Sequence, residues 1–434
     1  MNVDTLTFVI ESTKMAISRE SSQDEANEVQ LKSSSLALSK RFVQQFVRGF
    51  GSGLALYAGA KVVAAIMKNP FRKGLPGLGK DIICTDGVKF ATFLGLYPSI
   101  YHLSVDLLQK VRTTKDGWNH GLAGGIAGLS IIVESDTRRK AGSLFAIARA
   151  LGSGLTTLVK RGHITRIPYC ETISFCLSCA FLVYCTALEP NLLSKGYYYS
   201  ILKWSRDYTD DNLSLVFRKP AESFISCQAA GLHQESCTKH AFKDFCLSFP
   251  AFAKLYLPIH ATPMLLFRRK LLFQKPLAEL ITLARNLAMS SAFLATMVML
   301  AKYGLCVLRN IHGRPPPIPP LVPVVAGFVC GLGILFERTS RRKELALFLI
   351  PHTLYAFYLL VKQSRLKPLL GLPHGFVIMF SISMMGIMHA YEREPRSLTQ
   401  LTRGILNFFV AATNTHTVTH LSAVNKDSPG RYNH

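Results

Sequence analysis

Cysteine and histidine side chains gather in the middle of the sequence. Cys227, Cys237, His240 and Cys246, with His233 between them, could supply the thiolate and imidazole donors of a Cys3His zinc site. Cys237 and His240 are also one helical turn apart. The overall spacing is irregular, however, and matches no compact zinc signature. The pattern therefore favours a structural or redox-sensitive thiol cluster, with no bound metal and no cofactor.

The remaining residues that could do chemistry favour packing over catalysis. The sequence contains no phosphate-binding loop, nucleophile elbow, zinc-protease motif or dinucleotide fingerprint. His416 and His420 are spaced for a shared helix face, but no third ligand follows them. Four further cysteines occupy one apolar segment, where cysteine acts mostly as a small hydrophobe: Cys170, Cys176, Cys179 and Cys185. We predict a protein that is not an enzyme, with a lipid-modifying enzyme as the open alternative.

One phrase occurs twice in the chain. Residues 128–145 read GLSIIVESDTRRKAGSLF, and residues 331–348, at an offset of 203, read GLGILFERTSRRKELALF. Glu134 and Glu337 each stand four residues before an arginine, which predicts an ion pair across one helical turn. At membrane depth such a carboxylate would instead mark a functional site. Each phrase also contains a basic triplet: Arg138, Arg139 and Lys140 in the first, and Arg341, Arg342 and Lys343 in the second. The charges that the ion pair does not use are expected to bind anionic lipid headgroups.

Glycines precede each phrase with the spacing that lets helices approach closely. Gly124 and Gly128 lie on one helical face, as do Gly327 and Gly331. Their expected role is packing within the molecule, and a seam between copies or a cavity lining is the functional alternative.

The repeated phrase belongs to a longer repeat. Sequence similarity extends over two copies of roughly 170 residues, so the chain is expected to contain one unit twice. Each copy holds five apolar segments followed by a shorter amphipathic helix. The expected helices are 42–67, 84–109, 119–134, 141–159 and 168–188, then 242–267, 280–307, 321–337, 344–361 and 373–391.

Composition assigns these helices to a membrane. The chain is 49% hydrophobic and only 18% charged, against about 25% charged residues in an ordinary soluble domain. A soluble helical solenoid would also repeat, but its helices would carry polar faces through their middles. The stretch TISFCLSCAFLVYCTAL carries only small hydroxyls and thiols there. We predict an all-α, multi-pass membrane bundle built from two tandem copies of a five-to-six-helix unit.

The formal net charge of +24 does not indicate nucleic-acid binding. Lys and Arg stand between apolar runs, not on one face with interleaved aromatics, so the expected partners are anionic lipids. Because nearly every connection is basic, charge does not choose an orientation. The expected organisation is a polar leader (1–40), a first membrane repeat (41–208), a polar linker (209–239), a second membrane repeat (240–412) and a tail (413–434). The acidic leader resembles neither a mitochondrial presequence nor a secretory signal.

The residues resemble a known family. The segment ESCTKHAFKDFCLSFPAFAKLYLPIHATPMLLFRRKLL, residues 235–272, resembles the cysteine-rich segment of the transmembrane protein 135 family, as does the Gly-rich helix that ends in Glu134 or Glu337. The resemblance covers most of the chain from about Arg41. The family is similar in turn to the pore subunits of mitochondrial inner-membrane translocases. In two respects the chain departs from it: the Cys-rich segment lies mid-chain, and the first copy lacks an equivalent Cys and His set.

Two functions follow as expectations. The resemblance implies an integral protein of peroxisomes and mitochondria, linked to organelle division and lipid homeostasis, without an established reaction. The alternative is a pore or carrier for lipid, ions or polypeptide, which the duplicated architecture and short Gly-rich helices favour.

Overall fold

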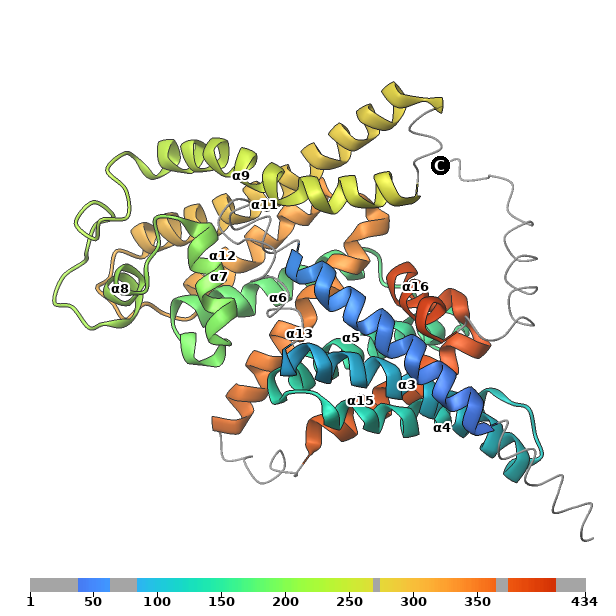
Figure 1. Ribbon diagram of the computed structural model, residues 1–434. Helices are drawn as coiled ribbons and strands as arrows, with labels where there is room; N and C mark the ends of the chain where they lie inside the picture. The colour runs from blue at the N-terminus through green and yellow to red at the C-terminus, as the bar shows by residue number, and fades with distance from the viewer. Residues whose placement is uncertain (1–37, 63–83, 268–273, 364–373, 411–434) are drawn as a thin grey trace, which may run out of the picture. The chain divides into compact units, whose positions relative to one another are not determined.

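The computed structural model describes residues 38–62, 84–267, 274–363 and 374–410 (Figure 1). Every regular element in these residues is a helix, and no strand occurs among them. The predicted all-α class is therefore confirmed. Most of the predicted leader, all of the tail, and His416 and His420 lie outside the described residues.

The helices lie close to where the hydropathy pattern predicted them. The first spans residues 38–62, so the end of the predicted 42–67 helix is outside the described part. The first half of the chain continues with α3 (Thr85–Arg112), α4 (Gly117–Gly128), α5 (Asp136–Lys160), α6 (Cys170–Ala187) and α7 (Lys195–Ser205). The second half contains α9 (Cys237–Phe267), α11 (Pro276–His312), α12 (Leu321–Gly331), α13 (Thr339–Gln363), α15 (Gly375–Arg393) and α16 (Gln400–Phe409).

The two glycine-rich helices differ from the prediction in one respect. Each changes to a 3-10 helix for its last turn: α4 continues as η1 (Leu129–Val133) and α12 as η4 (Leu332–Phe336). In this tighter turn each backbone amide donates to the carbonyl three residues earlier, so the groups at the helix end keep a partner. The Glu134 amide donates to Ile131 O and the Glu337 amide to Ile334 O, both at 3.0 Å.

The chain forms two compact units. Unit 1 contains Met1–Ser143 and Phe376–His434, and unit 2 contains Leu144–Gly375, so the boundary falls inside α5. Each unit takes helices from both halves of the chain. Helices α15 and α16 belong to unit 1, whereas α6 and α7 belong to unit 2.

In unit 1 the small residues of α4 face α15. A Cβ added at Gly128 would lie 2.8 Å from the Cα of Ser381, and one at Gly124 would lie 2.5 Å from the Met388 side chain. The Ser381 hydroxyl donates to Gly125 O across this contact. No residue larger than glycine fits at Gly128 without moving the backbone of α15.

In unit 2 the glycines of α12 face α6 in the same way. A Cβ at Gly327 would lie 2.7 Å from the Cα of Ala180, and one at Gly331 would lie 2.6 Å from the Cα of Cys176. A buried apolar cluster extends this contact to α11 and α13: Phe175, Cys179, Phe293, Cys330, Ile334 and Ala346. All four predicted packing glycines therefore meet a neighbouring helix.

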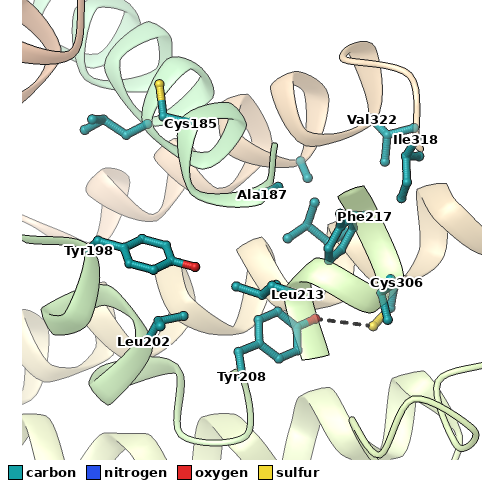
Figure 2. Close-up of a cluster of buried hydrophobic side chains, with 14 of the residues drawn as sticks. Cys185, Ala187, Tyr198, Leu202, Tyr208, Leu213, Phe217, Cys306, Ile318 and Val322 are labelled. Carbon is teal, nitrogen blue, oxygen red and sulfur yellow. Dashed lines mark hydrogen bonds between the residues drawn. The ribbon is translucent and has the colours of Figure 1, made fainter. Parts of the chain in front are cut away.

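A second part of unit 2 packs on the ends of α6 and α11. It contains α7, the short α8 (Asp210–Leu213) and the π-helix η3 (Ser214–Arg218). Ser194 caps α7 by accepting from the Tyr197 amide, and Thr209 caps α8 through the Asn212 amide. Their apolar side chains form one core with Cys185, Ile318 and Val322 (Figure 2).

Five helices are long and apolar enough to cross a membrane: α5, α6, α11, α13 and α15. Each also exposes large apolar side chains, for example Leu151, Leu177, Ile281, Phe348 and Ile382. Exposed apolar surface on so many helices is unusual for a soluble protein and ordinary for one surrounded by lipid. These helices therefore suggest an integral membrane protein.

Candidate functional site

Four side chains of types that can ligate metals meet in unit 2. Cys227, His233, Cys237 and Cys306 each offer one donor atom, and all four donors lie within 4.8 Å of one another. Cys227, His233 and Cys306 are buried, and Cys237 is partly exposed. Three thiols and one imidazole form the donor set of a tetrahedral zinc site.

Three separate stretches of chain bring these donors together. Cys227 and His233 lie in the segment after η3, where the chain turns at Gly231 with φ +69 and the Leu232 amide donates to Cys227 O at 3.0 Å. Cys237 opens α9, and Cys306 lies near the carboxyl end of α11. The cluster therefore joins the connecting segment to α9 and α11, the two longest helices of unit 2.

The imidazole of His233 is held in one orientation. Its Nδ1 lies 2.7 Å from Glu235 O, a distance at which Nδ1–H donates to the carbonyl. The other ring nitrogen, Nε2, then carries a lone pair and lies 3.9 Å from Cys306 Sγ. A backbone partner on one nitrogen is the usual arrangement of a histidine that binds metal through the other.

A buried arginine completes the cluster. Nη2 of Arg309 lies 2.9 Å from Cys227 Sγ, and Arg309 is only 2% exposed. A hydrogen bond with Cys306 and then the charge of Arg309 lower the pKa of the Cys227 thiol to about 5, against the opposing effect of burial. The hydroxyl of Tyr208 points at Cys306 Sγ from 3.7 Å on another side (Figure 2).

The structure assembles a different set from the one that sequence spacing suggested. Cys227 and Cys237 belong to the cluster, but His240 and Cys246 do not. The His240 ring stacks on His233 with centroids 4.6 Å apart, while its Nε2 lies 3.4 Å from Asp207 Oδ2. Cys246 is exposed. Spacing also missed Cys306, because it stands alone in an apolar helix far along the chain and carries no local signal.

A polar cavity of about 230 Å³ lies beside the cluster. Its walls include Arg206, His233, His240, Lys243 and Asp244. In its wall, an ion-pair network ties α11 to α9 and to the residues that follow α7: Lys302 Nζ lies 2.7 Å from Asp207 Oδ2 and 3.2 Å from Asp244 Oδ1. Lys302 is 5% and Asp244 2% exposed, so both charges depend on this pairing.

The repeated Glu and Arg residues lie together in each unit. In unit 1, Glu134 is buried with Arg138 Nη1 3.4 Å from its Oε2, and Arg138 Nη2 also lies 3.3 Å from Asp86 Oδ2. In unit 2, Glu337 is 2% exposed, and Arg341 Nη1 lies 3.1 and 3.0 Å from its two carboxylate oxygens. Ser290 adds a 2.6 Å hydrogen bond to Glu337.

The second arginine of each triplet binds backbone. Arg139 Nη2 donates to Ile132 O and Glu134 O at 3.0 and 2.9 Å, and Arg342 donates to Leu335 O and Glu337 O at 3.0 Å each. These carbonyls end the 3-10 helices, where no intrahelical partner is left for them. The lysines lie elsewhere: Lys140 Nζ is 2.6 Å from Asp136 Oδ2, and Lys343 Nζ donates to Thr156 at 2.8 Å.

A further ion pair lies between two of the membrane-compatible helices. Arg149 on α5 is 3% exposed and donates to the carboxylate of Glu344 on α13. The Arg149 guanidinium also lies over the Phe145 ring, 4.8 Å from its centroid. Because charges are costly inside a bilayer, such a pair would be a candidate functional site at membrane depth.

No protein-family model and no solved structure matches the chain.

Proposed function

We propose that this chain is a non-enzymatic, multi-pass protein of peroxisomal or mitochondrial membranes that acts in organelle organisation and lipid homeostasis. The observation that carries the proposal is the set of five membrane-compatible helices whose apolar side chains remain exposed. The resemblance of the cysteine-rich segment and of the repeated phrase to the transmembrane protein 135 family supplies the organelles and the process.

We propose in addition that the two halves of the chain are copies of one unit. Several contacts recur at matching positions. Gly128 packs against the Cα of Ser381, and Gly331 packs against the Cα of Cys176. The two glycines are 203 positions apart and their two partners 205 positions apart, so the pairs correspond if the offset between the copies drifts by two residues. The hydrogen bond from Arg139 to Ile132 O recurs 203 positions later as the bond from Arg342 to Leu335 O. The caps of α7 and α16, Ser194 and Thr399, recur at 205.

Anionic lipid is the proposed partner of the basic triplets. A guanidinium has five N–H donors, so the two carbonyl bonds of Arg139 or Arg342 leave donors for a phosphate. A basic side chain near the membrane surface gains about 1 kcal/mol from anionic headgroups, and salt screens this attraction.

Fractionation and lipid analysis test the proposal. The protein should stay in the pellet after alkaline carbonate extraction and should colocalise with peroxisomal or mitochondrial markers. Cells without it should show changed lipid composition and organelle shape. Recovery in the carbonate supernatant would rule out the membrane class, whereas a membrane protein whose loss leaves lipids and organelles unchanged would rule out the process alone.

The buried pair of Arg149 and Glu344 favours a second candidate, a pore or carrier. Flux of ions or fluorescent lipids through vesicles containing the purified protein would separate the two candidates. Glu344→Gln should change the flux, and Glu222→Gln, in the connecting segment, should leave it unchanged. Vesicles that are no leakier than protein-free ones would remove the second candidate.

A further inference from the structure

We propose that Cys227, His233, Cys237 and Cys306 bind one zinc ion in a closed, tetrahedral Cys3His site. This inference does not depend on the proposed membrane function. It rests on the distances between the four donors, on the orientation of His233 and on the buried charge of Arg309.

The donor separations match a tetrahedron of the right size. Zinc lies about 2.3 Å from thiolate sulfur and about 2.0 Å from imidazole nitrogen, so neighbouring ligand atoms lie about 3.5–3.8 Å apart. Cys227 Sγ and Cys306 Sγ are 3.9 Å apart, and Cys306 Sγ is 3.9 Å from His233 Nε2. No donor pair exceeds 4.8 Å. Shifts of about 0.5–1 Å in the donor atoms, within ordinary side-chain motion, would therefore complete the coordination.

Arg309 gives an independent reason for negative charge in the cluster. Its guanidinium is buried, and no carboxylate pairs with it among the described residues. Its Nη2 donates to Cys227 Sγ at 2.9 Å, and its guanidinium carbon lies 5.1 Å from the centroid of the Phe224 ring. Three neutral thiols would leave this cation without a counter-charge. Three thiolates around Zn²⁺ carry a net charge of −1, which Arg309 balances.

The histidine is already arranged for a metal. With Nδ1–H donated to Glu235 O, the neutral ring presents Nε2 to the thiols. A protonated or flipped ring would place an N–H donor there instead. Binding then releases to solvent the protons that the thiols still carry and none from His233, so charge and protons balance without any oxidant.

The chemistry selects zinc, and the site is structural. Soft thiolates with one imidazole in a tetrahedral arrangement suit Zn²⁺ better than Mg²⁺ or Ca²⁺, which need oxygen donors. Four protein ligands leave no open position for water or substrate. The ion would therefore fasten the segment around Cys227 to the start of α9 and the end of α11.

Metal analysis of the full-length protein in detergent tests the inference. Protein expressed with Zn²⁺ and purified without a metal-affinity step should contain one zinc per chain. Cys306→Ser, Cys227→Ser and His233→Ala should each lose the bound zinc. Cys246→Ser, from the spacing-based set, is the matched control and should retain it.

Cobalt substitution tests the wild-type site directly, so that a variant that fails to fold does not decide the outcome. Protein reloaded with Co²⁺ should show the strong visible bands of a tetrahedral thiolate complex. Arg309→Gln should weaken Co²⁺ and Zn²⁺ binding about 10–100-fold, the usual effect of losing a group that contacts a ligand, and Arg309→Lys should restore part of it.

Three results would overturn the proposal. The first is wild-type protein that binds neither Zn²⁺ nor Co²⁺ after reduction and reloading. The second is a Cys227–Cys306 disulfide in protein alkylated at the moment of cell lysis, which would make the cluster a redox pair. The third is a folded Cys306→Ser protein that keeps its zinc, since the ion would then lie elsewhere.

Discussion

Replacing Gly331 by alanine should loosen the packing of α12 on α6. The added Cβ would lie 2.6 Å from the Cα of Cys176, whereas carbon atoms pack best at about 3.5–4.0 Å. The helices must therefore separate by about 1 Å, which forfeits about a quarter to a half of each van der Waals contact along the seam. Overpacking of this kind costs about 1–3 kcal/mol, and the higher helix propensity of alanine offsets up to about 1 kcal/mol. With both ranges taken at their middle, the expected net loss is about 1.5 kcal/mol.

Thermal unfolding in detergent measures this loss. A destabilisation of that size lowers Tm by about 2–8 °C for a unit of this length. Gly154→Ala on α5 is the control in the same unit, because its added Cβ meets no atom within 4 Å and should be neutral or stabilising. In unit 1, Gly128→Ala and its control Gly386→Ala should behave as the same pair. A Gly331→Ala protein as stable as Gly154→Ala would refute the proposed close packing.

Three further predictions concern charged groups. Glu337→Ala should cost about 1.5–3 kcal/mol, since Ser290 and Arg341 lose their hydrogen bonds to the carboxylate and Arg341 keeps only Ser290 among the described residues. Glu134→Ala should cost less, because Arg138 keeps Asp86, and thermal unfolding of the two variants gives the order. The double variant Arg139→Ala, Arg342→Ala should lower the free energy of unfolding by about 1–3 kcal/mol per site, because the carbonyls that each arginine binds lose their partner. If the variant loses bound lipid but unfolds at the same temperature as the wild type, this structural role is wrong. Hydrogen bonds from Tyr198 and then Arg218 lower the pKa of Asp210 below 3.8, so its stabilisation is present at neutral pH and is lost as pH falls through the folded-state pKa. Asp210→Asn should therefore flatten the acid side of the stability profile, and an unchanged acid side would assign that dependence to other carboxylates.

The helices could be predicted because their cause is local. Apolar runs such as the one around Cys176 are long enough for a bilayer, and charged or Pro-rich segments bound them, so α6 was expected at 168–188 and occurs at Cys170–Ala187. The proximity of Glu337 and Arg341 could be predicted for the same reason, since four residues span one turn. Neither inference required knowledge of which helices pack together.

The rest could not be predicted, because it depends on contacts between distant residues. Cys306 looks like an ordinary core cysteine until α11 is placed beside Cys227, 79 positions earlier. Arg309 looks like a basic residue at a helix end, where it favours the helix dipole, and only the fold buries it. Arg149 and Glu344 meet across 195 positions. A periodic pattern predicts which face of a helix is buried but not which partner buries it.

The helix partners also imply an order of assembly. The glycine face of α12 packs on α6, which has already been made when α12 leaves the ribosome. The glycine face of α4 packs on α15, and so cannot be covered until residue 393 has been made. Because contacts between nearby segments form sooner than distant ones, unit 2 can complete its seam before unit 1 does. The Cys and His cluster lies within the unit that can close first, where it would hold α9 and α11 together while unit 1 still lacks α15.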